Sequence, residues 1–316
     1  MNTPPSAYPG FFFRRILVPL LHRYPFSGGI LRLANFQWIF REIDRSPSDV
    51  IARLRNGVPI RVRFGDFDGR VLYLFGRPDP RVVDLLLALA KPGEVFFDIG
   101  ANHGAVGFLI SDRVGPGGAV HLFEPQPGLC ARIREAQQAS SRPWIELHEC
   151  GLLDDEGELE LWETPGHTGV ATFAGKQAED AFAVRVPVRD LRKQLPPLVK
   201  GRSWGAKVDV EGVEMRLLPA LLSMPGMRYL VSESSHLDDP GLLWKVVRQN
   251  GHVLFGVSRS VLASRLIPLA GPAEIPKFED VLIAHLGEGP AITRPVAARQ
   301  IASRLVPSRG RPAAAL

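Results

Sequence analysis

Residues 95–104 read Val-Phe-Phe-Asp-Ile-Gly-Ala-Asn-His-Gly, an apolar run that leads into a glycine-rich turn. The run from Val95 to Ile99 predicts a buried strand, and the residues from Ala105 to Val114 predict a helix after the turn. Glycine at positions 100 and 104 lets the backbone turn sharply and come close to a ligand, because no Cβ is in the way. This strand, turn and helix are typical of the cofactor loop of a nucleotide-binding α/β enzyme.

Two acidic residues indicate which cofactor this loop binds. Asp98 precedes the turn, and Glu124 ends a second apolar run at a distance that suits two ribose hydroxyls. A dinucleotide loop usually reads G-x-G-x-x-G, whereas this loop reads G-x-x-x-G, and Asp98 would repel a pyrophosphate. The same acid suits the cationic amino group and sulfonium of S-adenosylmethionine. We therefore predict S-adenosylmethionine rather than NAD, with an ordinary structural turn as the alternative.

A third predicted strand also ends in acidic residues and a glycine, in the segment Lys207-Val-Asp-Val-Glu-Gly-Val-Glu214. Together with Asp98-Ile-Gly-Ala-Asn-His-Gly104 and Phe123-Glu-Pro125, it closely resembles the FkbM-like family of S-adenosylmethionine-dependent methyltransferases. The resemblance runs from about residue 80 to residue 285. It implies a Rossmann-like class I methyltransferase fold, an α/β domain with a seven-stranded, mostly parallel sheet and helices on both faces. It also implies methyl transfer to oxygen of a sugar or polyketide hydroxyl.

Ligands of such sheets bind beyond the carboxyl ends of the strands. Asp98 is predicted to approach the methionine end of the cofactor, and Glu124 to hold the ribose. The remaining predicted cofactor-binding residues are Gly100, Asn102, Gly104, Gly151, Leu152 and Asp209. By position and by resemblance, Asp209 and Glu211 face the transfer site, although a carboxylate at a strand end can instead cap the next helix.

Methyl transfer to a hydroxyl needs a base for the proton that leaves. Asp209 and His236 are the candidates for that base. Asp209, Glu211 and Glu233 could also gather oxygens for Mg²⁺, which would orient vicinal hydroxyls. The sequence contains no histidine-rich or cysteine-rich ligand pattern, so zinc is not expected.

Composition predicts one catalytic domain with extensions, because 316 residues with 45% hydrophobic and 22% charged side chains can bury one large core. We expect an N-terminal extension over residues 1–57 and a methyltransferase domain over 58–288. That domain is expected to open with a hairpin whose strands are 58–64 and 70–75. Residues 164–172 predict a mobile loop near the acceptor pocket. Residues 289–316 form a basic, Pro- and Ala-rich tail that we expect to be disordered at its end.

The net charge of +5 comes without a nucleic-acid-binding motif, so no nucleic acid partner is expected. Two cysteines fit a reducing cytoplasm. No apolar run is long enough to span a membrane. The aromatic and basic residues 11–26 predict either contact with the inner face of the membrane or a cover for the core or a dimer surface.

The sequence thus predicts an O-methyltransferase that acts on a sugar, glycan, glycolipid or secondary metabolite. One alternative is N-methylation of an amine, a protein or RNA. The strand after residue 203 lacks the Asp/Asn-Pro-Pro-Tyr/Phe signature of many amide and base methyltransferases, which counts against that alternative. The other is a non-catalytic nucleotide-binding protein, which the intact acidic and glycine positions disfavour.

Overall fold

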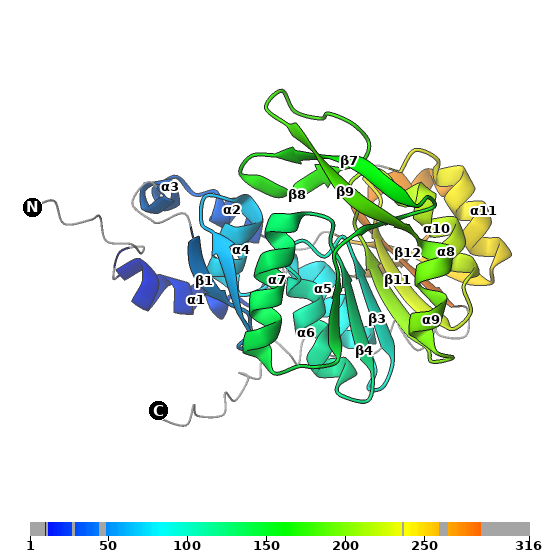
Figure 1. Cartoon of the computed structure of the whole chain (residues 1–316), viewed down its shortest axis with the longest axis horizontal. Helices are drawn as coiled ribbons and strands as arrows, with labels where there is room; N and C mark the ends of the chain where they lie inside the picture. Colours follow the sequence, from blue (N-terminus) through cyan, green and yellow to red (C-terminus); the bar gives the residue numbers. More distant parts are fainter. Residues whose placement is uncertain are drawn as a thin grey trace, which may run out of the picture.

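A central eight-stranded sheet with helices on both faces forms most of the molecule (Figure 1). The computed structural model describes residues 10, 12–26, 29–43, 49–235, 237–258 and 265–285. The strand order is β13-β12-β14-β11-β10-β3-β4-β5. These strands are β3 (Val95–Ile99), β4 (Ala119–Phe123), β5 (Ile145–His148), β10 (Trp204–Val208), β11 (Met227–Glu233), β12 (His252–Val257), β13 (Leu266–Pro268) and β14 (Asp280–His285).

The strand order creates a crevice at the centre of the sheet. The strands from β5 to β11 pair in parallel, whereas β14 lies antiparallel between β11 and β12. The chain runs from β3 outward to β4 and β5, and later resumes at β10 on the other side of β3. Crossovers therefore leave in opposite directions at β3 and β10, which opens a site at their carboxyl ends. This is the predicted Rossmann-like class I methyltransferase fold, with the short β13 as an eighth strand.

Apolar side chains on both faces of the sheet explain why its central strands read as nearly continuous hydrophobic runs. All five residues of β3 are buried. One face packs against α5 (Pro80–Leu89), α6 (Ala105–Val114) and α7 (Pro127–Ser140). The other packs against α8 (Leu191–Gln194), α9 (Pro196–Val199), α10 (Glu214–Ser223), α11 (Pro240–Gln249) and the 3₁₀ helix η2 (Pro272–Lys277).

The predicted hairpin over residues 58–75 is wrong in its second half. β1 (Asp49–Arg53) and β2 (Pro59–Arg63) form the hairpin, and residues Phe67–Phe75 form helix α4. Asp66 caps this helix by accepting a hydrogen bond from the Gly69 amide at 2.8 Å. An Asp N-cap ahead of a largely apolar helix outweighs the alternation that suggested a strand. The hairpin therefore spans the boundary that we predicted at residue 57.

The N-terminal segment partly covers the core. It contains the π-helix η1 (Phe13–Leu17) and the helices α1 (Val18–His22), α2 (Ile30–Ala34) and α3 (Gln37–Ile43). Phe13 is buried and packs edge-on against Phe64, with 5.8 Å between ring centroids. Phe12, Ile16 and Leu20 are exposed, and membrane contact through residues 11–26 stays a prediction. No helix of the described residues is long and apolar enough to cross a membrane. The predicted tail lies outside the described residues.

A second sheet of four strands extends from the central sheet toward α4 (Figure 1). Its order is β6-β9-β7-β8, with β6 (Gly151–Leu153), β7 (Gly157–Thr164), β8 (His167–Thr172) and β9 (Phe182–Asp190). The prediction of a loop over residues 164–172 is wrong, because β8 pairs antiparallel with β7. Its predicted place beside the pocket is correct, since His167 and Thr168 line the pocket.

Candidate cofactor and active site

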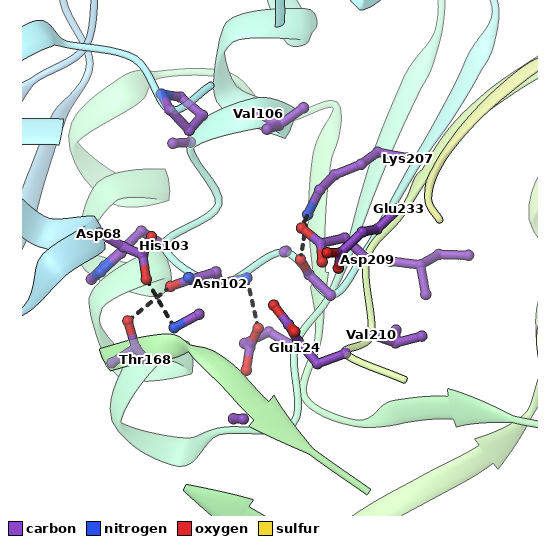
Figure 2. A pocket seen from close by; sticks show the side chains of 18 of the residues that line it. Asp68, Asn102, His103, Val106, Glu124, Thr168, Lys207, Asp209, Val210 and Glu233 are labelled. Carbon is purple, nitrogen blue, oxygen red and sulfur yellow. Dashed lines mark hydrogen bonds and ion pairs between the residues drawn. The ribbon is translucent and has the colours of Figure 1, made fainter. Parts of the chain in front are cut away.

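A pocket of about 370 Å³ lies at the carboxyl ends of the central strands. The strand ends of β3, β4, β10 and β11 form its floor, and residues of α4, α5 and β8 contribute to its walls. Figure 2 shows Lys207, Asp209 and Glu233 at one end, and Asp68, His103 and Thr168 at the other. The pocket therefore occupies the crevice that the strand order predicts.

The loop between β3 and α6 has the conformation that its glycines allow. Gly100 and Gly104 have φ of 76° and 71°, and Asn102 between them has φ of 51°. A Cβ on Gly100 would lie 1.9 Å from the Asp209 carbonyl oxygen. The loop that follows β3 thus packs directly against the backbone that follows β10, and both line the same pocket.

Glu124 fixes this loop from the end of β4. Its Oε2 accepts a hydrogen bond from the Asn102 amide at 2.7 Å, and its Oε1 accepts one from the Gln126 amide at 2.9 Å. Burial raises the pKa of Glu124 to about 7, although these two amide hydrogen bonds oppose the shift. Each carboxylate oxygen retains a second lone pair. The residue can therefore hold the loop and still accept hydrogen bonds from a ligand in the pocket that it lines.

Asp98 lies beneath the pocket rather than in its wall, which corrects the predicted direct contact with the cofactor. It is fully buried, and its Oδ2 accepts a hydrogen bond from the Gly107 amide at 2.8 Å. Its Oδ1 lies 3.8 Å from Lys207 Nζ. Burial raises the pKa of Asp98 to about 6, against the opposing effect of Lys207. Asp98 is therefore a positioning residue that holds the start of α6 and a buried cation.

Lys207 also lines the pocket, although it is not among the predicted site residues. Its Nζ donates to the Gly100 carbonyl oxygen at 2.8 Å and lies 3.1 Å from Asp209 Oδ2. Burial alone would lower the pKa of Lys207, but Asp209 and Asp98 outweigh that effect and raise it. A lysine within an otherwise apolar central strand was the available signal, since lysine is rarely buried without a partner.

Replacing Lys207 by Met is expected to destabilise the fold by about 3 kcal/mol at pH 8, because Asp98 would keep a buried charge without its cation. Lys207 lowers the pKa of Asp98 to its value of about 6, so without this lysine Asp98 would hold its proton to a higher pH, and the two folded proteins would differ in Asp98 charge only above about pH 6. The difference in the free energy of unfolding between the wild type and the Lys207→Met variant should therefore be smaller at pH 5.5 than at pH 8. Urea unfolding at both pH values measures it. Lys193→Met, at an exposed ion pair with Glu156, is the control, and an equal loss in both variants would contradict the account.

Three carboxylates gather at the strand ends opposite the glycine loop. Oxygens of Asp209, Glu211 and Glu233 lie within 4.8 Å of one another, as the Mg²⁺ prediction requires, and Mg²⁺ itself stays a prediction. Burial raises the pKa of Glu211 to about 9, and the charges of Asp209 and Glu233 add to the shift. Glu211 is therefore protonated at neutral pH. Asp209 is therefore a better candidate for the base than Glu211.

The opposite wall joins α4 to β8 through two aspartates, Asp66 and Asp68, which lie between the two strands of the predicted hairpin. Asp66 Oδ1 accepts a hydrogen bond from the Thr168 amide, and Asp68 Oδ2 accepts one from the Gly169 amide, at 2.8 and 2.9 Å. His103 Nε2 lies 3.4 Å from Asp66 Oδ2. These contacts connect the glycine loop, α4 and β8 around one side of the pocket.

The structure brings most of the predicted site residues together. Gly100, Asn102, Glu124, Asp209 and Glu211 line the pocket. Gly151 and Leu152, predicted to flank the adenine, line it as well. Gly104 begins α6 behind the loop, as its N-cap residue. His236 lies outside the described residues, so its predicted role as a base stays a prediction.

Comparison with known proteins finds similarity to methyltransferases. No model of a known protein family matches the chain. Over 187 residues, the chain is 28% identical to 31-O-demethyl-FK506 methyltransferase FkbM of Streptomyces tacrolimicus. The matched region covers 50% of this chain and 70% of that protein.

Solved structures with a similar arrangement share less sequence. An S-adenosylmethionine-dependent O-methyltransferase of Thermotoga maritima aligns with a TM-score of 0.40 and 10% identity, over 78% of this chain and 81% of that chain. Aeropyrum pernix fibrillarin with bound S-adenosylmethionine aligns with a TM-score of 0.35 and 13% identity. That alignment covers 65% of this chain and 74% of the fibrillarin chain. The inference of function therefore depends on the residues of the pocket.

Proposed function

We propose that this chain is an FkbM-like, S-adenosylmethionine-dependent O-methyltransferase. The observation that carries the proposal is Glu124, a buried carboxylate fixed by two backbone amides and facing the pocket beside the glycine loop. The cofactor would supply a methyl group on a sulfonium leaving group. Glu124 would accept hydrogen bonds from its ribose, the loop at Gly100 would lie beside its methionine moiety, and Gly151 and Leu152 would flank its adenine.

The charge of the pocket supports a cationic cofactor and a hydroxyl-bearing acceptor. Acidic side chains in the lining outnumber the lysine and arginine side chains, Lys207 and Arg81, by eight to two, and by seven to two without the protonated Glu211. The acidic side chains are Asp68, Asp79, Glu124, Asp209, Glu211, Glu233, Glu279 and Asp280. Carboxylates accept hydrogen bonds from hydroxyls and repel phosphates. We therefore favour a sugar, glycan or secondary-metabolite hydroxyl over RNA as the acceptor.

The residues of the pocket can assist the transfer without further groups. Lys207 holds Asp209 at 3.1 Å, so this carboxylate would keep a fixed position from which to accept the acceptor's proton. The walls from α4 and β8 would exclude water and align the acceptor oxygen. Similarity to a protein named as a 31-O-demethyl-FK506 methyltransferase agrees with this assignment.

Calorimetric titration of the wild-type chain tests the cofactor assignment. S-adenosylmethionine and S-adenosylhomocysteine should bind in the micromolar range, and NAD should not. Methyl transfer from labelled cofactor is then measured on hydroxyl-bearing glycans and polyketides, with RNA as the comparison. Binding of NAD instead would refute the cofactor assignment, and transfer to RNA alone would refute the acceptor class.

Cofactor binding should release protons between about pH 7 and pH 9. A sulfonium near Glu211 lowers the pKa of that group from about 9, so a carboxyl that is protonated in the free protein loses its proton. Affinity should therefore rise with pH over this range. Titration in buffers of different ionisation enthalpy counts the protons. S-adenosylhomocysteine, which lacks the sulfonium charge, should release fewer, and equal release by both ligands would contradict the placement of the sulfonium.

A further inference from the structure

Two histidines and a glutamate meet at the edge of the central sheet, outside the residues that line the cofactor pocket. His121 lies on β4, and Glu146 and His148 lie on the edge strand β5. His121 is paired with Glu146 in the sheet register, and His148 follows two residues later, so all three side chains project from the same face. This arrangement is a direct result of strand pairing between segments about 25 residues apart.

The three side chains are close enough to share one ion. His121 Nδ1 lies 3.1 Å from His148 Nε2 and 3.4 Å from Glu146 Oε2. Glu146 Oε1 lies 3.9 Å from His148 Nε2. Ligands about 2.0–2.1 Å from a tetrahedral Zn²⁺ are about 3.3 Å from one another. The 3.1 Å and 3.4 Å separations approximate edges of a coordination tetrahedron, and one ligand atom from each of the three residues lies within 4.8 Å of the other two.

The sheet also fixes the orientation of both imidazoles. The His148 ring stacks on Phe123 with 4.4 Å between centroids and 11° between planes. The His121 ring stacks on Phe97 at 5.6 Å and 27°. Both phenylalanines are buried, so ring positions are held before any ligand binds, which reduces the entropy cost of binding.

We propose that His121, Glu146 and His148 form a site for a divalent transition metal of the zinc class. Two imidazole nitrogens and one carboxylate are a ligand set that Zn²⁺ and Co²⁺ accept, and a water molecule would complete the tetrahedron on the exposed side of Glu146. The bound ion would attach the edge strand β5 to β4. This proposal is independent of the proposed methyltransferase function, and it departs from our expectation that the chain has no zinc ligands.

Zinc titration of the full chain tests the site. After removal of metal with a chelator, Zn²⁺ alone should bind by calorimetry with one ion per chain, and the thermal midpoint should rise. His148→Gln and Glu146→Gln should each weaken Zn²⁺ binding at least tenfold. Because the Glu146 side chain is 60% exposed, its variant should fold even if the His148 variant does not. Co²⁺ should give the visible absorption of a tetrahedral site, which both variants should lose.

Two control variants separate this site from other candidate ligands. His285→Gln removes a histidine from the other imidazole pair of the sheet, His252 and His285, whose ring centroids are 5.7 Å apart. Glu233→Gln alters the carboxylate cluster of the pocket. Both controls should keep wild-type Zn²⁺ affinity. Absence of Zn²⁺ binding, unchanged affinity in the Glu146 variant, or loss of binding in the Glu233 variant alone would overturn the proposal.

Discussion

The Glu124→Gln variant is expected to bind S-adenosylmethionine about 100-fold more weakly than the wild-type protein. Hydrogen bonds to a charged group contribute about 1.5–3 kcal/mol each, and a 100-fold loss corresponds to about 2.8 kcal/mol. The amide side chain offers one acceptor, whereas the Asn102 and Gln126 amides both need one. Its NH₂ group therefore faces a backbone donor, and one ribose hydroxyl loses its anionic partner.

Glu135→Gln is the matched control, because that carboxylate is about half exposed on α7 and pairs with Arg61 at 2.7 Å. Its cofactor affinity should equal that of the wild type. Calorimetric titration at pH 8, where more of Glu124 is ionised than at its pKa of about 7, gives the clearest comparison. Equal affinities in the Glu124 variant and the wild type would show that this carboxylate does not contact the cofactor.

Gly100→Ala is expected to destabilise the protein by about 3–5 kcal/mol and to abolish cofactor binding. A left-handed residue other than glycine costs about 1–3 kcal/mol, and overpacking adds about as much again. At position 100 the new Cβ would lie 1.9 Å from a backbone oxygen of Asp209, which no side-chain rotation can relieve. The loop after β3 would have to move away from the loop after β10.

Gly57→Ala separates the cost of overlap from the cost of backbone conformation. Gly57 has φ of 86°, but a Cβ there would meet no atom within 4 Å. The Gly57→Ala variant should therefore lose only about 1–2 kcal/mol of its free energy of unfolding and should bind the cofactor as the wild type does. Urea unfolding and cofactor titration on both variants make the comparison. A similar loss of stability in the two would mean that the contact with Asp209 can relax.

The central sheet was predictable because its strands are buried on both faces and carry an unambiguous apolar signal. Val95–Ile99 and Ala105–Val114 have the predicted bounds, and the strand-end residues Gly100, Glu124 and Asp209 meet as predicted. Strand ends on one edge of a parallel sheet converge whatever their separation along the chain. A pattern of short apolar strands with acids at their ends therefore carries three-dimensional information.

Features that depend on tertiary contact were not predictable. Asp98 was predicted to approach the methionine end of the cofactor because it lies near the end of a strand, but its side chain points beneath the floor to Gly107 and Lys207. Residues 164–172 look like a loop by composition, and pairing with β7 makes them a strand. The proximity of His121 to His148 requires knowledge of strand register, which glycine or apolar patterns do not encode.

The attachment of β8 to α4 has a consequence for engineering this protein. Asp66 and Asp68 hold the amides of Thr168 and Gly169, so one short chain segment in the wall of the pocket is anchored through its backbone. Side chains at positions 167, 168, 170 and 171 can be randomised without removing the amide anchors, unless proline replaces Thr168. Gly169 must stay glycine, because a Cβ there would lie 2.5 Å from Asp68 Oδ2. A mutant library restricted to residues 167, 168, 170 and 171 would therefore vary part of one wall of the pocket while leaving the ends of the central strands unchanged.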